Sequence, residues 1–310
     1  MFDSLISFFI IAALGAFFQW KKLGGINSYA ARHVINTIVI NFFLPALCFK
    51  VIATATIDKN TVLLPASAII TILSSLLISF TIYTIIEKFM TLNKKEKGAL
   101  ILASSFGNVT FLGLLFLTGL YGQSTAKYVL LYDFLATTPL LWPVGATIAS
   151  YYGRGQKLTF KESSKIIAEL PPVWAFAAGF TANFLGIHLP SFLLKTLDIM
   201  SMAIIPLMMF SIGLALSAPK LKHAIIAIPA IIIKLCLAPL IAFETALLLG
   251  MDGLALKSTV MEAAMPTMIF TSVISSQYKL DHALSALIIV LSTIISLITL
   301  PLTSWLIRGY

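Results

Sequence analysis

The stretch VMEAAMPTMIF, residues 260–270, lies inside an apolar run that is long enough to cross a bilayer. It places a carboxyl group, that of Glu262, one helical turn before Pro266. Proline removes one backbone hydrogen bond from a helix and clashes with the preceding turn. Inside hydrocarbon the freed polar groups must be satisfied by protein or must line a water-filled cavity. The stretch therefore predicts an interrupted membrane helix with an acid beside the interruption.

The composition of the chain is that of a polytopic membrane protein. Of its 310 residues, 59% are hydrophobic and 11% are charged, whereas soluble domains carry about 25% charged residues. We therefore expect an all-α protein that has the lipid bilayer as its surroundings. Cys48 and Cys236 lie in apolar runs without ligand spacing, so no disulfide framework and no metal site is indicated. No bound cofactor is expected either.

Ten apolar segments are predicted to span the membrane, because each is close to the length of about 20 residues that a crossing helix needs. The first is expected to be retained, since Lys21 and Lys22 follow it, whereas a cleaved signal peptide has its basic residues in front. Cutting the chain at its polar clusters places the spans at residues 2–20, 33–55, 62–89, 98–121, 126–150, 171–187, 191–217, 222–249, 254–276 and 282–307.

The distribution of positive charge predicts the orientation of these spans. With the N-terminus outside, fourteen of the 21 Lys and Arg residues fall on the inner side and five on the outer side. This bias predicts both termini on the extracytoplasmic side of a plasma membrane, which is the inner membrane in a bacterium. Because the basic residues sit in short loops between spans, the net charge of +9 does not indicate binding to nucleic acid.

The longest polar connection divides the ten spans into two groups of five. Residues 1–150 form the first predicted repeat, 151–170 a cytoplasmic connecting loop, and 171–310 the second repeat. Span two contains FFLPALCFKVIA and span seven contains AIIPLMMFSIGL, two matching strings. An odd number of spans per half gives the two copies opposite orientations, the inverted repeats found in secondary transporters. Thr159 and Glu162 have capping-box spacing, which leaves open whether the loop holds a short surface helix or is a solvated linker.

Spans four and nine carry matching interruptions. FGNVTFLG, residues 106–113, aligns with AAMPTMIF, residues 263–270, and the expected break points are Gly107–Asn108 and Pro266. Interrupted segments at corresponding positions indicate a transporter's central site, where the positive ends of half-helices can face an anion. The alternative is a pair of plain structural kinks. The candidate substrate-binding residues in these two spans are Gly107, Asn108, Thr110, Met265, Pro266 and Thr267.

A few charged residues lie within spans, where they are costly and normally face a cavity, are paired or are protonated. Burial disfavours the charged form of a carboxyl group, so Glu262 is a candidate proton carrier; alternatively it satisfies the backbone that Pro266 frees. Asp133 and Lys50 are further coupling candidates, and Lys50 could also neutralise an anionic substrate, pair with Asp133 or reach the interface. Lys234 and Glu244 could snorkel or pair with another helix.

Four strings resemble those of the auxin efflux carrier family, which includes plant auxin exporters and bacterial malonate-type carriers. They are NTIVINFFLPALCF in span two, FGNVTFLGLLFL in span four, EAAMPTMIFTSVISSQY in span nine and LSTIISLITLPLTSWL in span ten. The resemblance implies ten helices in two inverted five-helix repeats, with spans four and nine broken and crossed. It also implies a scaffold domain, a transport domain that moves like an elevator, and export or exchange of small organic anions.

The same resemblance places Asn108 and Pro266 at the crossing of the broken helices, with Asn41 and Pro45 of span two as wall residues. Plant members generally have proline at both crossings, whereas this chain has Val109 at the position that aligns with Pro266. The first break must therefore rely on Gly107 and Asn108. A homodimer is compatible with an elevator carrier, although no interface is identified.

Other functions share part of this pattern. A Na⁺/H⁺ antiporter or a Na⁺-coupled bile-acid-type symporter would have the same broken helices, and backbone carbonyls of unwound segments can bind Na⁺ without a sequence signature. An antiporter needs paired carboxylates, for which Asp133 is the one partner available to Glu262. A passive channel is the alternative from another class. No HExxH, GxSxG or P-loop motif occurs, so an enzyme is not expected. The substrate stays open among malonate, other carboxylates and indole acids.

Overall fold

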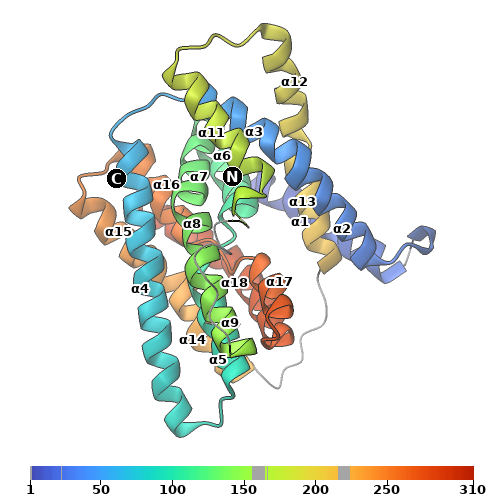
Figure 1. Cartoon of the computed structure of the whole chain (residues 1–310), viewed down its shortest axis with the longest axis vertical. Coiled ribbons are helices and arrows are strands. Elements are labelled where there is room, and N and C mark those ends of the chain that lie inside the picture. The colour runs from blue at the N-terminus through green and yellow to red at the C-terminus, as the bar shows by residue number, and fades with distance from the viewer. Residues whose placement is uncertain (1, 22, 156–164, 166, 216–223) are drawn as a thin grey trace. The chain divides into compact units, whose positions relative to one another are not determined.

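The computed structural model of the protein describes residues 2–21, 23–155, 165, 167–215 and 224–310 (Figure 1). Every regular element in this part of the chain is a helix, which confirms the all-α prediction. Six helical segments are long and apolar enough to cross a membrane: Ser28–Ala53, Asn60–Phe89, Gln123–Arg154, Ser191–Leu214, Ala224–Leu248 and His282–Leu306. Helix also covers most of the described part of the other four predicted spans, in shorter or interrupted pieces.

The chain folds into two compact units, and each unit combines segments from both halves of the sequence. Unit 1 comprises Met1–Thr56, Thr118–Lys127 and Ala168–Ala218. Unit 2 comprises Ile57–Leu117, Tyr128–Ile167 and Pro219–Tyr310. The division into repeats of residues 1–150 and 171–310 concerns internal similarity and stays a prediction. Half of the predicted connecting loop, with Thr159 and Glu162, lies outside the described residues.

Unit 1 is built from two tight helix pairs, in which α1 packs against α13 and α3 packs against α11. Its helices are α1 (Phe2–Lys21), α2 (Ser28–Ile38), the π-helical turn η2 (Val39–Phe43), α3 (Leu44–Ala53), α11 (Pro171–Phe184), α12 (Ser191–Met202) and α13 (Ile204–Ala215), with the short 3₁₀ turns η1 (Leu23–Gly25) and η4 (Gln123–Thr125).

Glycines allow these pairs to approach closely. A Cβ added to Gly15 of α1 would clash with the Phe210 carbonyl of α13, and one added to Gly213 of α13 would clash with the Ala12 carbonyl of α1. In the second pair, a Cβ on Gly179 of α11 would lie 2.7 Å from the Phe49 carbonyl oxygen of α3. Small residues at helix contacts are the usual means of close packing in membranes, where lipid gives no hydrophobic drive for association.

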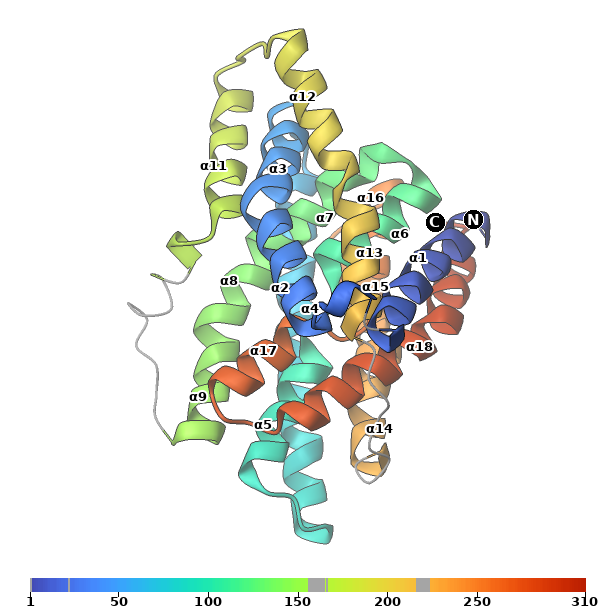
Figure 2. The ribbon, with the colours of Figure 1, turned by 90° about the vertical axis from the view of Figure 1, so that its right-hand side faces the viewer.

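Unit 2 contains the longest helix, α4 (Asn60–Phe89), which packs against α5 (Lys94–Ser105) and α15 (Ala238–Leu248). Figure 2 shows α17 (Phe270–Gln277) and α18 (His282–Leu306) lying against α5. The other elements of unit 2 are η3 (Val109–Gly113), η5 (Asp133–Thr137), α8 (Thr138–Leu140), η6 (Leu141–Gly145), α9 (Ala146–Arg154), α14 (Ala224–Ile232), η8 (Ile233–Leu237) and α16 (Gly253–Ala263). Two helices are divided between the units: α6 (Leu114–Tyr121) belongs to unit 2 up to Leu117, and α7 (Ala126–Tyr132) belongs to it from Tyr128.

Buried hydroxyl groups link the helices of unit 2. Ser104 of α5 donates to Ser79 of α4 at 2.7 Å, and the Tyr83 hydroxyl of α4 donates to the Ile226 carbonyl of α14 at 3.0 Å. Interhelical hydrogen bonds of this kind stabilise membrane bundles by about 0.6–2 kcal/mol each. They fix α4 and α14 around α5, the helix that leads into the first break.

Replacing Gly213 by valine is expected to destabilise unit 1, because the new side chain would meet the Ala12 carbonyl and force α1 and α13 apart. Overpacking of this kind costs about 1–3 kcal/mol, which would lower the midpoint of thermal unfolding in detergent. Gly309→Ala is the control, since no heavy atom outside its immediate neighbours lies within 4 Å of a Cβ added there. Equal midpoints for the two variants would contradict the close α1–α13 contact.

Candidate functional site

The first predicted break forms although no proline is present. The helix α5 starts with a capping box between Asn93 and Glu96 and ends at Ser105. Phe106 (φ −104°, ψ 119°) and Asn108 (φ −81°, ψ 61°) leave the helical region, and helix resumes at Val109 as the π-helical turn η3. The chain therefore unwinds at Gly107 and Asn108 without a proline, as the sequence predicted for this half.

The second break lies in span nine and pairs with the first. The helix α16 ends at Ala263 and α17 begins at Phe270, with Pro266 in the unwound segment between them. The Asn108 N–H donates to the Pro266 carbonyl at 2.7 Å, and the Met268 N–H donates to the Phe106 carbonyl at 2.9 Å. These bonds form an isolated antiparallel bridge centred on Gly107 and Thr267. Each break thus supplies partners for the backbone groups that the other has freed.

Thr267 holds the crossing to the helices around it. Its hydroxyl donates to the Ala103 carbonyl near the end of α5 at 2.7 Å, and its N–H donates to the Ser292 hydroxyl of α18 at 3.1 Å. The expected substrate-binding residues of spans four and nine are therefore brought together, and the side chains of Asn108, Thr110, Met265 and Thr267 are all buried. In this conformation the crossing is closed.

An open cavity lies elsewhere in unit 2. It has a volume of about 460 Å³ and is lined by side chains of α4, α5, η6 and α9. The lining is almost wholly apolar, and it includes none of the predicted site residues. The cavity therefore has the character of a surface that faces lipid, and the candidate site is the crossing.

Asp133 is held beside the first break by two hydroxyl groups. The Thr110 hydroxyl of η3 donates to one carboxylate oxygen, and the Thr138 hydroxyl of α8 donates to the other at 3.0 Å. The Asp133 side chain is buried, in the π-helical turn η5. An ionised carboxylate is an acceptor only, so two donors suit its charged form. The hydroxyl of Thr110, predicted to bind substrate, is thus used within the protein.

Glu262 is fully buried, and neither of its carboxyl oxygens has a hydrogen-bond partner among the described residues. It lies directly against Gly113, where an added Cβ would clash with both oxygens. The carboxyl group also interacts electrostatically with Asp133 and Lys234. The missing side chain at Gly113 therefore makes the space that Glu262 occupies, next to the half-helix that follows the first break.

Lys234 is the site residue that the sequence did not identify. Its side chain is buried in the π-helical turn η8, and its ammonium donates to the Ala263 carbonyl at the end of α16 at 2.5 Å. A Cβ added to Gly107 would lie 2.8 Å from the Lys234 Cε. The cation thus touches the backbone of both broken spans. The sequence did contain a signal for this role. Lys234 lies near the middle of an apolar span, whereas a lysine that snorkels to the interface lies near a span end.

A family model described as membrane transport protein matches residues 1–170 and 157–304 of the chain. The chain belongs to this family, the auxin efflux carrier family. It is a membrane transporter and not an enzyme.

Three relatives of this family member cover nearly all of it. A protein of Methanocaldococcus jannaschii named "Uncharacterized transporter" is 28% identical over 310 residues, which is 98% of each chain. Another "Uncharacterized transporter", from Methanothermobacter thermautotrophicus, is 29% identical over 97% of each chain. A Rhizobium meliloti protein named "Putative malonate transporter" is 26% identical over 89% of this chain and 87% of the relative.

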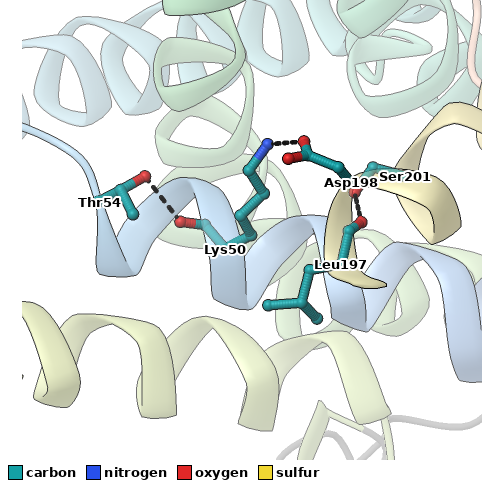
Figure 3. A network of polar contacts seen from close by, with 5 residues as sticks. All are labelled: Lys50, Thr54, Leu197, Asp198 and Ser201. Carbon is teal, nitrogen blue, oxygen red and sulfur yellow. Dashed lines mark hydrogen bonds and ion pairs between the residues drawn. The ribbon is translucent and has the colours of Figure 1, made fainter. Parts of the chain in front are cut away.

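The remaining predicted site residues of this auxin efflux carrier family member belong to unit 1. Lys50 of α3 forms an ion pair with Asp198 of α12, so its partner is Asp198 and not Asp133 (Figure 3). The two side chains are 26% and 44% exposed, a setting in which ion pairs contribute about 0–1 kcal/mol. The side-chain amide of Asn41 donates to the Thr37 carbonyl at 2.8 Å within its own helix. Pro45 lies in the first turn of α3.

Gly113→Ala is expected to destabilise the transporter, because the methyl group would clash with the Glu262 carboxyl. Overpacking costs about 1–3 kcal/mol. In a Glu262→Ala background the same substitution should cost less, since the carboxyl is no longer there. Thermal unfolding of the parent, both single variants and the double variant measures this coupling. Additive effects would show that the two residues do not touch.

Proposed function

We propose that the protein is a secondary transporter that moves small organic anions, carboxylates such as malonate or auxin-like acids, by elevator-type alternating access. The observation that carries this proposal is the antiparallel pairing of two unwound segments at Gly107 and Thr267 inside unit 2. Unwound segments of two broken helices are the usual site of substrate binding in secondary transporters. A membrane transport family and a relative named for malonate support the substrate class.

Ten membrane helices in two inverted repeats form the architecture of this proposal. The first two spans of each half lie in unit 1 and the last three lie in unit 2, except that Thr118–Lys127, at the end of span four and the start of span five, belongs to unit 1. Within unit 1 the first span of each half packs on the second span of the other, as α1 on α13 and α11 on α3. The matched residues Phe49 and Phe210 face glycines, Gly179 and Gly15, in the two pairs. Equivalent contacts at equivalent positions are expected of an inverted repeat.

Unit 2 is proposed as the transport domain, because it contains both broken spans, and unit 1 as the scaffold. The distribution of Lys and Arg supports an orientation with both termini on the extracytoplasmic side of the plasma membrane. We also propose a homodimer. Pairing of the two scaffold units would hold the scaffolds still in the bilayer while the transport domains move.

The substrate is proposed to bind at the crossing, with Asn108, Pro266 and their neighbours around its carboxylate. The half-helices that begin at Val109 and Phe270 direct partial positive charge toward the unwound segments. Asn41 and Pro45 of span two are further candidate substrate-binding residues, on the basis of the family resemblance. Glu262 and Asp133 are proposed to link transport to a proton.

Uptake by reconstituted protein tests the proposed function. We expect saturable uptake of radiolabelled malonate or another small carboxylate, with counter-flow, by liposomes that contain the parent protein. Asn108→Ala should lower the uptake about tenfold or more, because a hydrogen bond to a charged group contributes about 1.5–3 kcal/mol. Asn27→Ala is the matched control, since this asparagine only caps the start of α2 and should leave the uptake unchanged.

Two results would contradict the proposal. Flux that does not saturate and shows no counter-flow would indicate a passive channel. Na⁺-for-H⁺ exchange without anion flux would indicate an antiporter, a function that the presence of Asp133 and Glu262 in one electrostatic cluster also suits.

A further inference from the structure

The Lys234 ammonium lies at the crossing with most of its hydrogen-bonding capacity unused. An ammonium has three N–H donors, and among the described residues Lys234 has one acceptor, the Ala263 carbonyl. It takes part in none of the ion pairs found in the described ranges, and its side chain is 3% exposed. A buried charge is costly unless it is paired and hydrogen-bonded. The position therefore suits an anion that arrives from outside the protein.

Two buried acids, Asp133 and Glu262, lie in the same cluster as Lys234. Asp133 already accepts hydrogen bonds from Thr110 and Thr138, whereas Glu262 accepts none from the described residues. The Glu262 carboxyl interacts electrostatically with both Lys234 and Asp133. Its charge is therefore the one in the cluster that depends most on Lys234.

The other titratable groups around Glu262 do not change the dependence of its charge on Lys234. Tyr132 of α7 interacts electrostatically with the Glu262 carboxyl and is itself buried. The remaining elements packed on α16 are α4, α15, α18 and η3, and η3 has no titratable side chain. Tyr83 of α4 is buried, with its hydroxyl bonded to a carbonyl of α14. The titratable side chains at exposed positions on these helices are Glu87, Lys88, Glu244 and His282.

We infer that Lys234 binds the carboxylate of the transported anion and that Glu262 takes up one proton when it does. The inference rests on the proposed function and adds the group that recognises the substrate. A carboxylate bound at Lys234 brings a further negative charge beside Glu262 and Asp133, and a neighbouring like charge disfavours the charged form of a carboxyl. The proton comes from water on the side of loading, binds a Glu262 oxygen, and returns to water on the other side when the anion leaves.

This coupling fixes the charge that crosses the membrane. A monocarboxylate and its proton carry no net charge together, whereas a dicarboxylate such as malonate keeps one negative charge. Uptake of malonate should therefore respond to an imposed membrane potential, and uptake of a monocarboxylate should not.

Calorimetric titration of the purified protein with malonate and with indole-3-acetate tests the inference. Repeating each titration in buffers of different ionisation enthalpy reports the protons taken up. For the parent protein we expect the uptake of about one proton for each anion that binds. Glu262→Gln should still bind the anion but take up no proton. Lys234→Met should bind at least about tenfold more weakly, and Lys234→Arg, which keeps the charge, should retain more of the affinity.

Lys97→Met is the matched control. Lys97 is also a buried lysine of unit 2, but it is paired with Glu87 at 2.6 Å, so its replacement should leave anion affinity and proton uptake unchanged. Thermal unfolding of each variant in detergent shows whether it is folded. If Lys234→Met does not fold, the number of protons taken up by Glu262→Gln still tests the inference.

The outcomes separate the inference from the proposed function. If the parent binds neither anion nor any other carboxylate of a panel, both are overturned. If the parent binds but folded Lys234→Met binds equally well, or Glu262→Gln takes up as many protons as the parent, the inference alone is overturned. Anion binding that requires Na⁺ and takes up no proton would likewise overturn the coupling while leaving the carrier in place.

Discussion

Two helices are broken inside the protein, where their unwound backbone groups need hydrogen-bond partners other than bulk water. The rest of the site depends on how these partners are supplied. Each unwound segment would leave amide and carbonyl groups without partners, at several kcal/mol per group. The two segments satisfy one another instead, through bonds from Asn108 to Pro266 and from Met268 to Phe106. Neither break would be stable alone, so spans four and nine must cross. The ends of the half-helices are then held near one point, where their partial charges are available to a ligand.

Absent side chains at this crossing make room for charged ones. Gly107 admits the Lys234 side chain and Gly113 admits the Glu262 carboxyl, and an added Cβ would meet either group. Around the first break the chain therefore has two glycines, each of which faces a buried charge from another span. A methyl group at either position would push the charge away from the unwound backbone. Gly107, in the unwound segment, and Gly113, in the π-helical turn that follows it, thus make room for the two charged side chains.

The breaks could be predicted from the sequence because their signals are local. Pro266 removes a hydrogen bond wherever it lies in a helix, and Gly107–Asn108 is a weak helical segment in a long apolar run. Partners across the bundle could not be predicted in the same way. Which helices pack on α16 decides that Glu262 lies near Lys234, and the placement of α12 decides that Lys50 pairs with Asp198 and not with Asp133. Such pairings depend on the packing of helices that are distant in sequence.

The two compact units bear on the proposed transport mechanism, because each of them combines segments from both halves of the sequence. Unit 1 contains the first two predicted spans of each half together with Thr118–Lys127, and unit 2 contains the rest of the predicted spans. The crossing of the two broken spans lies within unit 2, where its backbone bonds link the segment after α5 to the segment between α16 and α17. Its charges, Asp133, Lys234 and Glu262, come from spans five, eight and nine of the same unit. Movement of unit 2 would therefore carry the substrate site and the titratable acid together, which is the condition for moving an anion and a proton in one step.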